Sequence, residues 1–219
     1  MTSRGRLVLP SRTLLAQKQH FILDFDGTLA DTTAAHAEAY RRVFSEFDIQ
    51  FDYRDVAGLA TDAAVKRLLD AASIVLRPAD VERLVVQKQA IARELLPTAV
   101  GWLDGVVDFF SWAEQSGKIL SLVTSASRGT LDVALRSLQE APVFHICLTR
   151  DDVVNGKPDP EGFLTAMQNA RVTPERCIVF EDSEAGLAAA RAAGLDHVRI
   201  TRSVWSDIAT MMEVEGQRR

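Results

Sequence analysis

The chain has 219 residues and a formal net charge of −5, from 25 lysines and arginines against 30 aspartates and glutamates. This length suits one core domain with a modest insertion, and the acidic balance provides no basic surface for nucleic acid. No apolar stretch is long enough to span a bilayer, so we expect no membrane partner. Cys147 and Cys177 both lie in apolar runs, which indicates reduced core thiols in a cytoplasmic protein.

Residues 1–19 are rich in basic side chains, with Arg4, Arg6, Arg12 and Lys18, and contain no acid. Organellar transit peptides have a similar composition, but the continuous apolar centre of a secretory signal is absent. We therefore expect these residues to form a short flexible leader, disordered or packed on the surface.

An acidic pair, Asp24 and Asp26, closes the first apolar run, residues 21–23. Because side chains alternate in extended backbone, both carboxylates can point to one side while Phe25 packs away from it. Two like charges held so close repel unless a cation lies between them or one carboxyl keeps its proton and acts as an acid. Both conditions suit phosphoryl chemistry, although an ordinary acidic turn before Gly27 would use the same residue types.

The interval between residues 31 and 101 indicates a helical insertion. Apolar residues recur there at helical spacing in three groups: Tyr40, Phe44 and Phe47 within 34–47; Val65, Leu68, Leu69 and Ala72; and Val81, Leu84, Val85 and Leu95 after the start signal Pro78. We expect these stripes to form the core of a small helical cap, residues 33–99, with hinges near 30–33 and 96–102. A cap that closes would exclude water and select the substrate.

A hydroxyl pair and a lysine follow two later apolar runs. Thr124 and Ser125 come after residues 119–123, and such hydroxyls can donate to an anion, although they also suit the N-cap of the next helix. Lys157 comes after residues 143–148, and the proline that follows it restricts its backbone, so the ammonium is presented from a rigid loop. A solvated loop charge is the alternative for this lysine.

A second acidic pair, Glu181 and Asp182, follows residues 177–180. It can complete a site for a hard cation, or cap the helix that begins near Glu184. Strands and helices alternate from residue 21 onward, which predicts an α/β fold: a Rossmann-like parallel sheet core, residues 20–32 and 100–219, with helices on both faces and the small helical cap inserted. Sites in such sheets lie at the carboxyl ends of strands, where all four motifs fall.

The joint pattern is Asp-x-Asp-Gly-Thr, then a hydroxyl, a lysine and Glu-Asp-Ser, each after an apolar strand, and it closely resembles the haloacid dehalogenase (HAD) superfamily from about residue 20 to 201. The resemblance implies that Asp24 is a phosphorylated nucleophile and Asp26 the general acid/base. It implies phosphate binding by Gly27, by Lys157, and by Thr124 or Ser125, of which the count from Gly117 favours Thr124. It implies a Mg²⁺ site formed by Asp24, Asp26, Glu181 and Asp182. Dehalogenases of this superfamily lack the second aspartate, so Asp26 favours phosphate chemistry.

Two further residues are candidates for contact with the substrate. His36 lies five residues after Asp31, a spacing similar to that of β-phosphoglucomutase and related sugar phosphatases, in which this histidine reaches the active site. A surface histidine is the alternative. Arg128 follows the hydroxyl loop and can contact phosphate, or it is an ordinary first-turn surface residue.

We therefore expect a Mg²⁺-dependent phosphatase that hydrolyses a small phosphorylated metabolite, a sugar phosphate or related monoester, through an aspartyl-phosphate. One alternative is a β-phosphoglucomutase-like phosphomutase, but Thr61 stands where such mutases carry a cap arginine for a second phosphate. Substitutes for that arginine would be Lys66, Arg67, Lys88 and Arg93, which on helices are more often solvated. Another alternative is a phospho-accepting signalling module, which has little use for a cap. The substrate and the choice between monomer and dimer stay open.

Overall fold

Strand β2 (His20–Leu23) lies inside a six-stranded sheet in the computed structural model, which describes residues 6–7 and 9–213. The strand order is β1-β8-β7-β2-β5-β6, and each of these pairs is parallel. The other strands are β1 (Arg6–Leu7), β5 (Ile119–Val123), β6 (Ile146–Leu148), β7 (Cys177–Glu181) and β8 (Asp196–Arg199). Because the chain changes direction across the sheet at β2, the carboxyl end of this strand is a point where ligand sites form.

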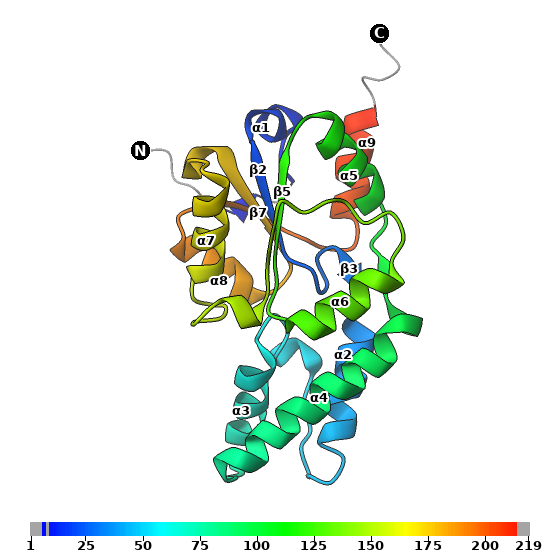
Figure 1. Ribbon diagram of the computed structural model, residues 1–219, viewed down its shortest axis with the longest axis vertical. Helices are drawn as coiled ribbons and strands as arrows, with labels where there is room; N and C mark the ends of the chain where they lie inside the picture. Colours follow the sequence, from blue (N-terminus) through cyan, green and yellow to red (C-terminus); the bar gives the residue numbers. More distant parts are fainter. Residues whose placement is uncertain (1–5, 8, 214–219) are drawn as a thin grey trace.

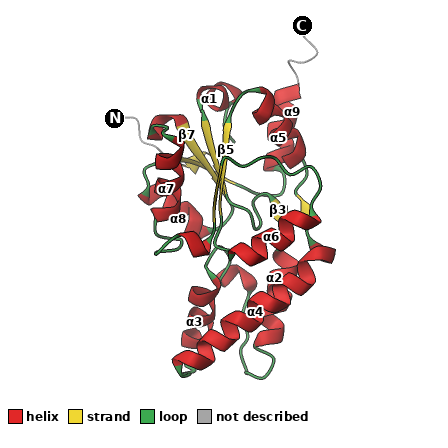
Figure 2. Ribbon diagram, in the orientation of Figure 1, coloured by secondary structure: helices red, strands yellow, loops and turns green. Residues whose placement is uncertain are grey.

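Helices cover both faces of the sheet (Figures 1 and 2). One face is covered by α5 (Val106–Gln115), α6 (Arg128–Ser137) and α9 (Val204–Glu213), and the other by α7 (Glu161–Ala170) and α8 (Glu184–Ala192). On the first face Phe21 and Phe180 pack with Phe109, and on the second Ile22 packs with Phe163. With both faces buried, the central strands β2, β5 and β7 are largely apolar, as is usual for parallel sheets. The prediction of a Rossmann-like α/β core is confirmed.

The described part of the N-terminal segment, expected as a leader that is disordered or packed on the surface, lies folded against the core. Helix α1 (Arg12–Gln17) is capped by Ser11 and buries Leu15, while β1 extends the edge of the sheet. Buried Lys18 donates to the carbonyl of Glu175 and to Asp196, each at 2.6 Å. The described residues of this segment therefore pack on the core, the second of the two arrangements expected, through buried partners that the basic composition did not reveal. Residues 1–5 and 8 lie outside the described part of the chain.

The residues between β3 (Ala30–Asp31) and β4 (Gly101–Trp102) form a helical insertion at the carboxyl end of the sheet (Figure 1). Its elements are α2 (Thr33–Val43), the 3-10 helix η1 (Tyr53–Asp55), α3 (Thr61–Ala71) and α4 (Pro78–Ala99). They enclose a separate core that includes Tyr40, Phe44, Val65, Leu68 and Leu84, residues of the predicted stripes. Strands β3 and β4 pair antiparallel, so the two connections to the sheet lie side by side.

Within the described residues no helix combines the length and apolar character that crossing a membrane requires.

Candidate active site

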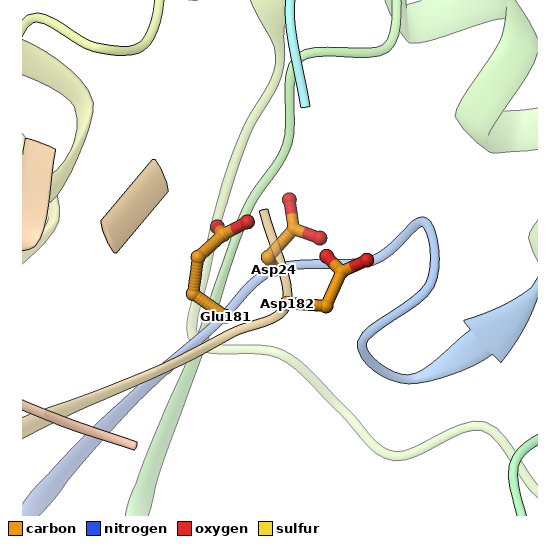
Figure 3. Close-up of side chains that lie close together, drawn as sticks. All are labelled: Asp24, Glu181 and Asp182. Carbon is orange, nitrogen blue, oxygen red and sulfur yellow. The ribbon is translucent and has the colours of Figure 1, made fainter. Parts of the chain in front are cut away.

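Three carboxylates meet at the carboxyl ends of β2 and β7 (Figure 3). Ligand oxygens of Asp24, Glu181 and Asp182 lie within 4.8 Å of one another. The two strands are paired, with Leu23 opposite Phe180, so the side chains at their ends emerge together. Burial, and then the charge of Glu181, raise the pKa of Asp24 well above its usual range and the pKa of Asp182 to about 7. A cation would relieve this excess of negative charge, and a set of oxygen donors suits Mg²⁺.

Lys157 supplies the positive charge of this cluster. Its Nζ donates to Asp24 at 2.6 Å, to Glu181 at 2.7 Å and to the carbonyl of Val123 at 3.1 Å. Burial alone would lower the pKa of Lys157, but the charges of Asp24 and Glu181 outweigh burial and raise it. The other oxygen of Glu181 accepts from the N–H and hydroxyl of Ser183, at 3.2 and 2.7 Å. Glu181 is thus held at both oxygens, which leaves Asp24 and Asp182 as the freer metal ligands.

The glycine and threonine that follow the first acidic pair position Asp182. Gly27 has φ +81°, and a Cβ at this position would overlap the Asp182 carboxylate. The Thr28 hydroxyl donates to the same carboxylate at 3.1 Å, and the Thr28 carbonyl accepts from the indole of Trp205 at 2.6 Å. The Asp-Gly-Thr sequence therefore shapes the space around Asp182 as well as the turn.

The Asp26 side chain faces the helical insertion. Its carboxylate accepts from Thr32 at 2.7 Å and from His36 at 3.1 Å, and lies 3.4 Å from the Thr124 hydroxyl. Burial alone would raise the pKa of Asp26, but its interactions with His36, Thr32 and Lys88 lower it to about 2. In the described residues the cluster of possible metal ligands does not include this carboxylate, in contrast to the expected four-residue site.

Lys88 is buried behind His36. Its Nζ lies 2.9 Å from His36 Nδ1 and 4.5 Å from the centroid of the Tyr40 ring. An ammonium can only donate, so we assign Nδ1 as the acceptor and the ring proton to Nε2, which donates to Asp26. Burial, and then the charge of Lys88, lower the pKa of His36; burial lowers the pKa of Lys88 to about 8. A neutral imidazole therefore connects an ammonium to a carboxylate.

The two hydroxyls after β5 point to different partners. Thr124 is buried beside Asp26, and its hydroxyl oxygen accepts from the N–H of Ala126 at 3.1 Å. The Ser125 hydroxyl donates to the carbonyl of Gly58 in the insertion at 2.8 Å. Of the two hydroxyls, that of Thr124 is therefore the one directed at Asp26.

The Arg128 guanidinium does not join the site. It donates to the carbonyl of Cys147 at 2.9 Å and to Asp152 at 2.6 Å, beside β6. The expectation that Arg128 contacts phosphate is therefore replaced by a structural role, because the end of β6 provides closer partners for it.

A pocket of about 490 Å³, partly open to solvent, separates the core from the insertion. The core contributes Asp24, Asp26, Thr124, Ser125, Ala126, Ser127 and Thr130; the insertion contributes His36, Tyr40, Tyr53, Val56, Gly58, Leu59, Thr61 and Lys88. The sequence interpretation assigned Tyr40 to packing, and named Lys88 as one of four possible substitutes for a cap arginine that on helices are more often solvated. A signal for Lys88 was available, since it lies four residues from Leu84 and from Ala92 on the buried stripe of α4.

Gly58 brings the insertion into contact with the core at two places. Its carbonyl accepts from Ser125, and a Cβ at this position would overlap the Ser183 side chain. The backbone has φ +77°, a conformation that favours glycine. One residue of the insertion therefore contacts both the hydroxyl loop and the loop that carries Asp182.

Comparison with known proteins agrees with this geometry. A family model described as haloacid dehalogenase-like hydrolase matches residues 21–200. The chain is 32% identical to fructose-1-phosphate phosphatase YqaB of Escherichia coli over 82% of its own length and 94% of that protein. It is 29% identical to β-phosphoglucomutase of Bacillus subtilis, over 80% and 79% of the two chains. The crystal structure of CbbY from Rhodobacter sphaeroides in complex with phosphate superposes with a TM-score of 0.72 at 26% identity, covering 83% of this chain and 85% of that one.

Proposed function

The chain belongs to the haloacid dehalogenase-like hydrolases, and from this premise we propose that it is a Mg²⁺-dependent phosphatase acting on a sugar phosphate or a related small monoester. The observation that carries the proposal is the contact of Asp24 with Lys157 at 2.6 Å, beside Asp182 and beneath Asp26 and Thr124. A carboxylate beside an ammonium and further carboxylates suits attack on a phosphate ester. The phosphatase among the similar proteins supports the same chemistry.

The proposed reaction has two displacements at phosphorus. In the first, an Asp24 oxygen bonds to phosphorus, the ester P–O bond breaks, and Asp26, whose pKa the negative charge of the bound phosphate ester would raise so that it is protonated, gives its proton to the leaving oxygen. In the second, water gives a proton to Asp26 and bonds to phosphorus, and the bond to Asp24 breaks, which releases phosphate. Lys157 and the Thr124 hydroxyl hold the transferring group throughout. Bound Mg²⁺, held by Asp24 and Asp182 with Glu181 beside them, would offset the repulsion between carboxylate and phosphate.

We further propose that residues 33–99 act as a cap over the core formed by 20–32 and 100–219. The pocket lies between these two parts, and its wall on the side of the insertion contains the side chains that would contact the leaving group. The paired strands β3 and β4 form a narrow connection about which the insertion can move. Free Cys147 and Cys177 are in keeping with a reducing, cytoplasmic location.

The pocket favours a phosphatase over a phosphomutase. Thr61 lines it and is hydrogen bonded to Tyr40, so no guanidinium is presented there to a second phosphate. Among the lining residues Lys88 is the cation from the insertion, and its ammonium is already bonded to His36. A signalling module is disfavoured because the insertion covers Asp24, which a kinase domain would have to reach.

The test is release of inorganic phosphate from sugar phosphates, phosphoglycolate, glycerol phosphates and nucleotides, with and without Mg²⁺. We expect Mg²⁺-dependent turnover of a small monoester, loss of that turnover in Asp24→Asn, and unchanged chemistry in the control Cys147→Ser. Activity that needs no metal and survives in Asp24→Asn would overturn the mechanism. Interconversion of sugar phosphates without phosphate release would favour the mutase.

A further inference from the structure

An ion pair joins the start of α3 to the core. Nη2 of Arg150, in the 3-10 helix η2 (Arg150–Asp152), lies 3.2 Å from a carboxylate oxygen of Asp62, in the first turn of α3. Figure 1 shows α3 well apart from β3, where the insertion is connected to the core. A rotation about that connection would therefore change the Arg150 to Asp62 distance strongly. The contact of His36 with Asp26 lies close in sequence to the connection and would change less.

Arg150 is anchored firmly on the core side. Its Nη1 donates to the carbonyl of Val153 at 2.9 Å, and its backbone N–H donates to the carbonyl of Ala126 at 2.9 Å. The second bond ties η2 to the loop that carries Thr124. The Asp62 side chain, by contrast, is about half exposed, at 54%. It lies in the first turn of α3, where the helix dipole stabilises a negative charge. The moving partner of the pair is thus Asp62.

The same arginine lies against the residue that precedes Lys157. A Cβ placed on Gly156 would be 3.5 Å from Arg150 Cδ and 3.7 Å from the Ala60 methyl group of the insertion. A side chain at Gly156 would therefore meet both the arginine and the residue before α3, which lie on the same side of the Gly156 backbone. Movement of α3 away from the core would withdraw Ala60 from this space, one residue from the phosphate-binding ammonium, while Arg150 would stay with the core.

We propose that Arg150 and Asp62 are positioning residues that seat the cap on the lysine loop, so that cap closure and the placement of Lys157 are coupled. This inference rests on the proposed phosphatase function for its kinetic consequence, but the contact itself is tested independently below. Neither residue touches the reacting atoms. Loss of the pair leaves the chemistry of Asp24 and Asp26 intact and makes the closed, substrate-binding arrangement less populated.

The kinetic experiment compares wild type with Asp62→Asn, Arg150→Gln and the reversed pair Asp62→Arg/Arg150→Asp, using p-nitrophenyl phosphate and Mg²⁺. The matched control is Arg41→Gln, which removes an exposed ion pair to Glu38 inside the insertion. We expect KM to rise about two- to fivefold in each single variant, the range of an exposed ion pair, with kcat changed less. The reversed pair should restore most of the loss, and Arg41→Gln should match wild type. The difference in KM between wild type and the single variants should shrink at about 0.5 M NaCl, where the Debye length is only a few ångströms.

The second measurement is amide hydrogen exchange of the free protein over residues 58–62 and 150–157. We expect both segments to exchange faster in each single variant, because the insertion is then held less tightly against the core. Arg41→Gln should exchange like wild type. Unchanged KM and exchange in the single variants, or a reversed pair no better than they are, would overturn the proposal. A wild type that hydrolyses no phosphate ester would instead refute the proposed function, and the exchange result would still decide whether the pair seats the insertion.

Discussion

Lys88 donates a hydrogen bond of 2.9 Å to Nδ1 of His36, deep between the insertion and the core. This bond determines which imidazole nitrogen carries the proton, since Nδ1 must accept and Nε2 must then donate. The direction of the hydrogen bond to Asp26 is thereby determined by a residue on another helix. Lys88 acts on the proposed acid/base without touching it.

Replacing Lys88 tests this arrangement. In Lys88→Met, Nδ1 can carry the proton, so His36 no longer donates reliably to Asp26. We expect kcat to fall roughly tenfold, part of the 10²–10⁴-fold that general acid–base catalysis supplies. The control is Lys66→Met, an exposed lysine on α3 that should leave kcat unchanged. Equal kcat values for Lys88→Met and wild type would refute the role of the lysine.

Gly58→Ala should reduce activity strongly while the protein still folds. The methyl group would overlap Ser183 and keep the insertion from seating, while each core packs as before. We expect KM to rise about tenfold or more, with a loss of unfolding free energy of about 1–2 kcal/mol from the positive φ. Gly117→Ala is the matched control, because Gly117 has φ +61° with open space around it. The idea fails if steady-state kinetics of the two variants are alike.

Turnover should depend on bound Mg²⁺ and on Asp182 as one of its ligands. Chelation by EDTA should abolish turnover, and added Mg²⁺ should restore it. Asp182→Asn loses one anionic oxygen and should raise the Mg²⁺ concentration for half-maximal activity roughly tenfold or more. The exposed Asp48→Asn is the control. Titration calorimetry with Mg²⁺ alone checks the same loss without turnover, and equal affinities in wild type and Asp182→Asn would contradict the assignment.

The stability of the protein in acid should depend on His20. Burial, and then the charge of His145, lower the pKa of His20 to about 4, and its Nε2 lies 2.6 Å from Ser121 Oγ in the core. Between pH 6.5 and 4 the unfolded chain binds more protons than the native one. The stability due to the neutral ring is therefore complete above pH 6.5 and is lost as pH falls toward 4, by about 3 kcal/mol in all. Urea unfolding across this pH window should show that the free energy of unfolding falls less in His20→Asn than in wild type. The same pH dependence in both proteins would contradict the prediction.

Much of the site was predictable because its residues stand at the ends of parallel strands. Asp24 and Asp182 directly follow paired strands, whose ends a parallel sheet brings to one edge, whereas Lys157 lies in the loop beyond β6 and η2, and its position depends on that loop. The helical insertion was likewise visible in the 3.6-residue stripes, although α2 ends at Val43 and Phe47 packs from beyond it. These features depend on local pattern and on topology.

The remaining features depend on tertiary partners that no pattern displays. From the sequence, Arg128 could contact either phosphate or β6. The tertiary structure shows that its guanidinium donates to Asp152 and to the Cys147 carbonyl. Lys18 belongs to a basic segment, yet it is buried against Asp196. For Lys88 the stripe gave a signal, but an amphipathic lysine at such a position usually extends to solvent. The roles assigned to individual site residues stay predictions until the variants above are measured.

The pairing of β3 with β4 has an evolutionary consequence. Ala30 lies opposite Trp102, so the chain leaves the core and returns to it at neighbouring points. The whole helical insertion can therefore be lengthened, rearranged or exchanged between related chains while the sheet and its carboxylates keep their places. Substitutions at Tyr53 or Thr61 would alter the wall of the pocket and leave Asp24, Lys157 and Asp182 untouched. Variation of the helical insertion can thus change which molecules the pocket accepts, while the residues at the ends of the sheet strands stay the same.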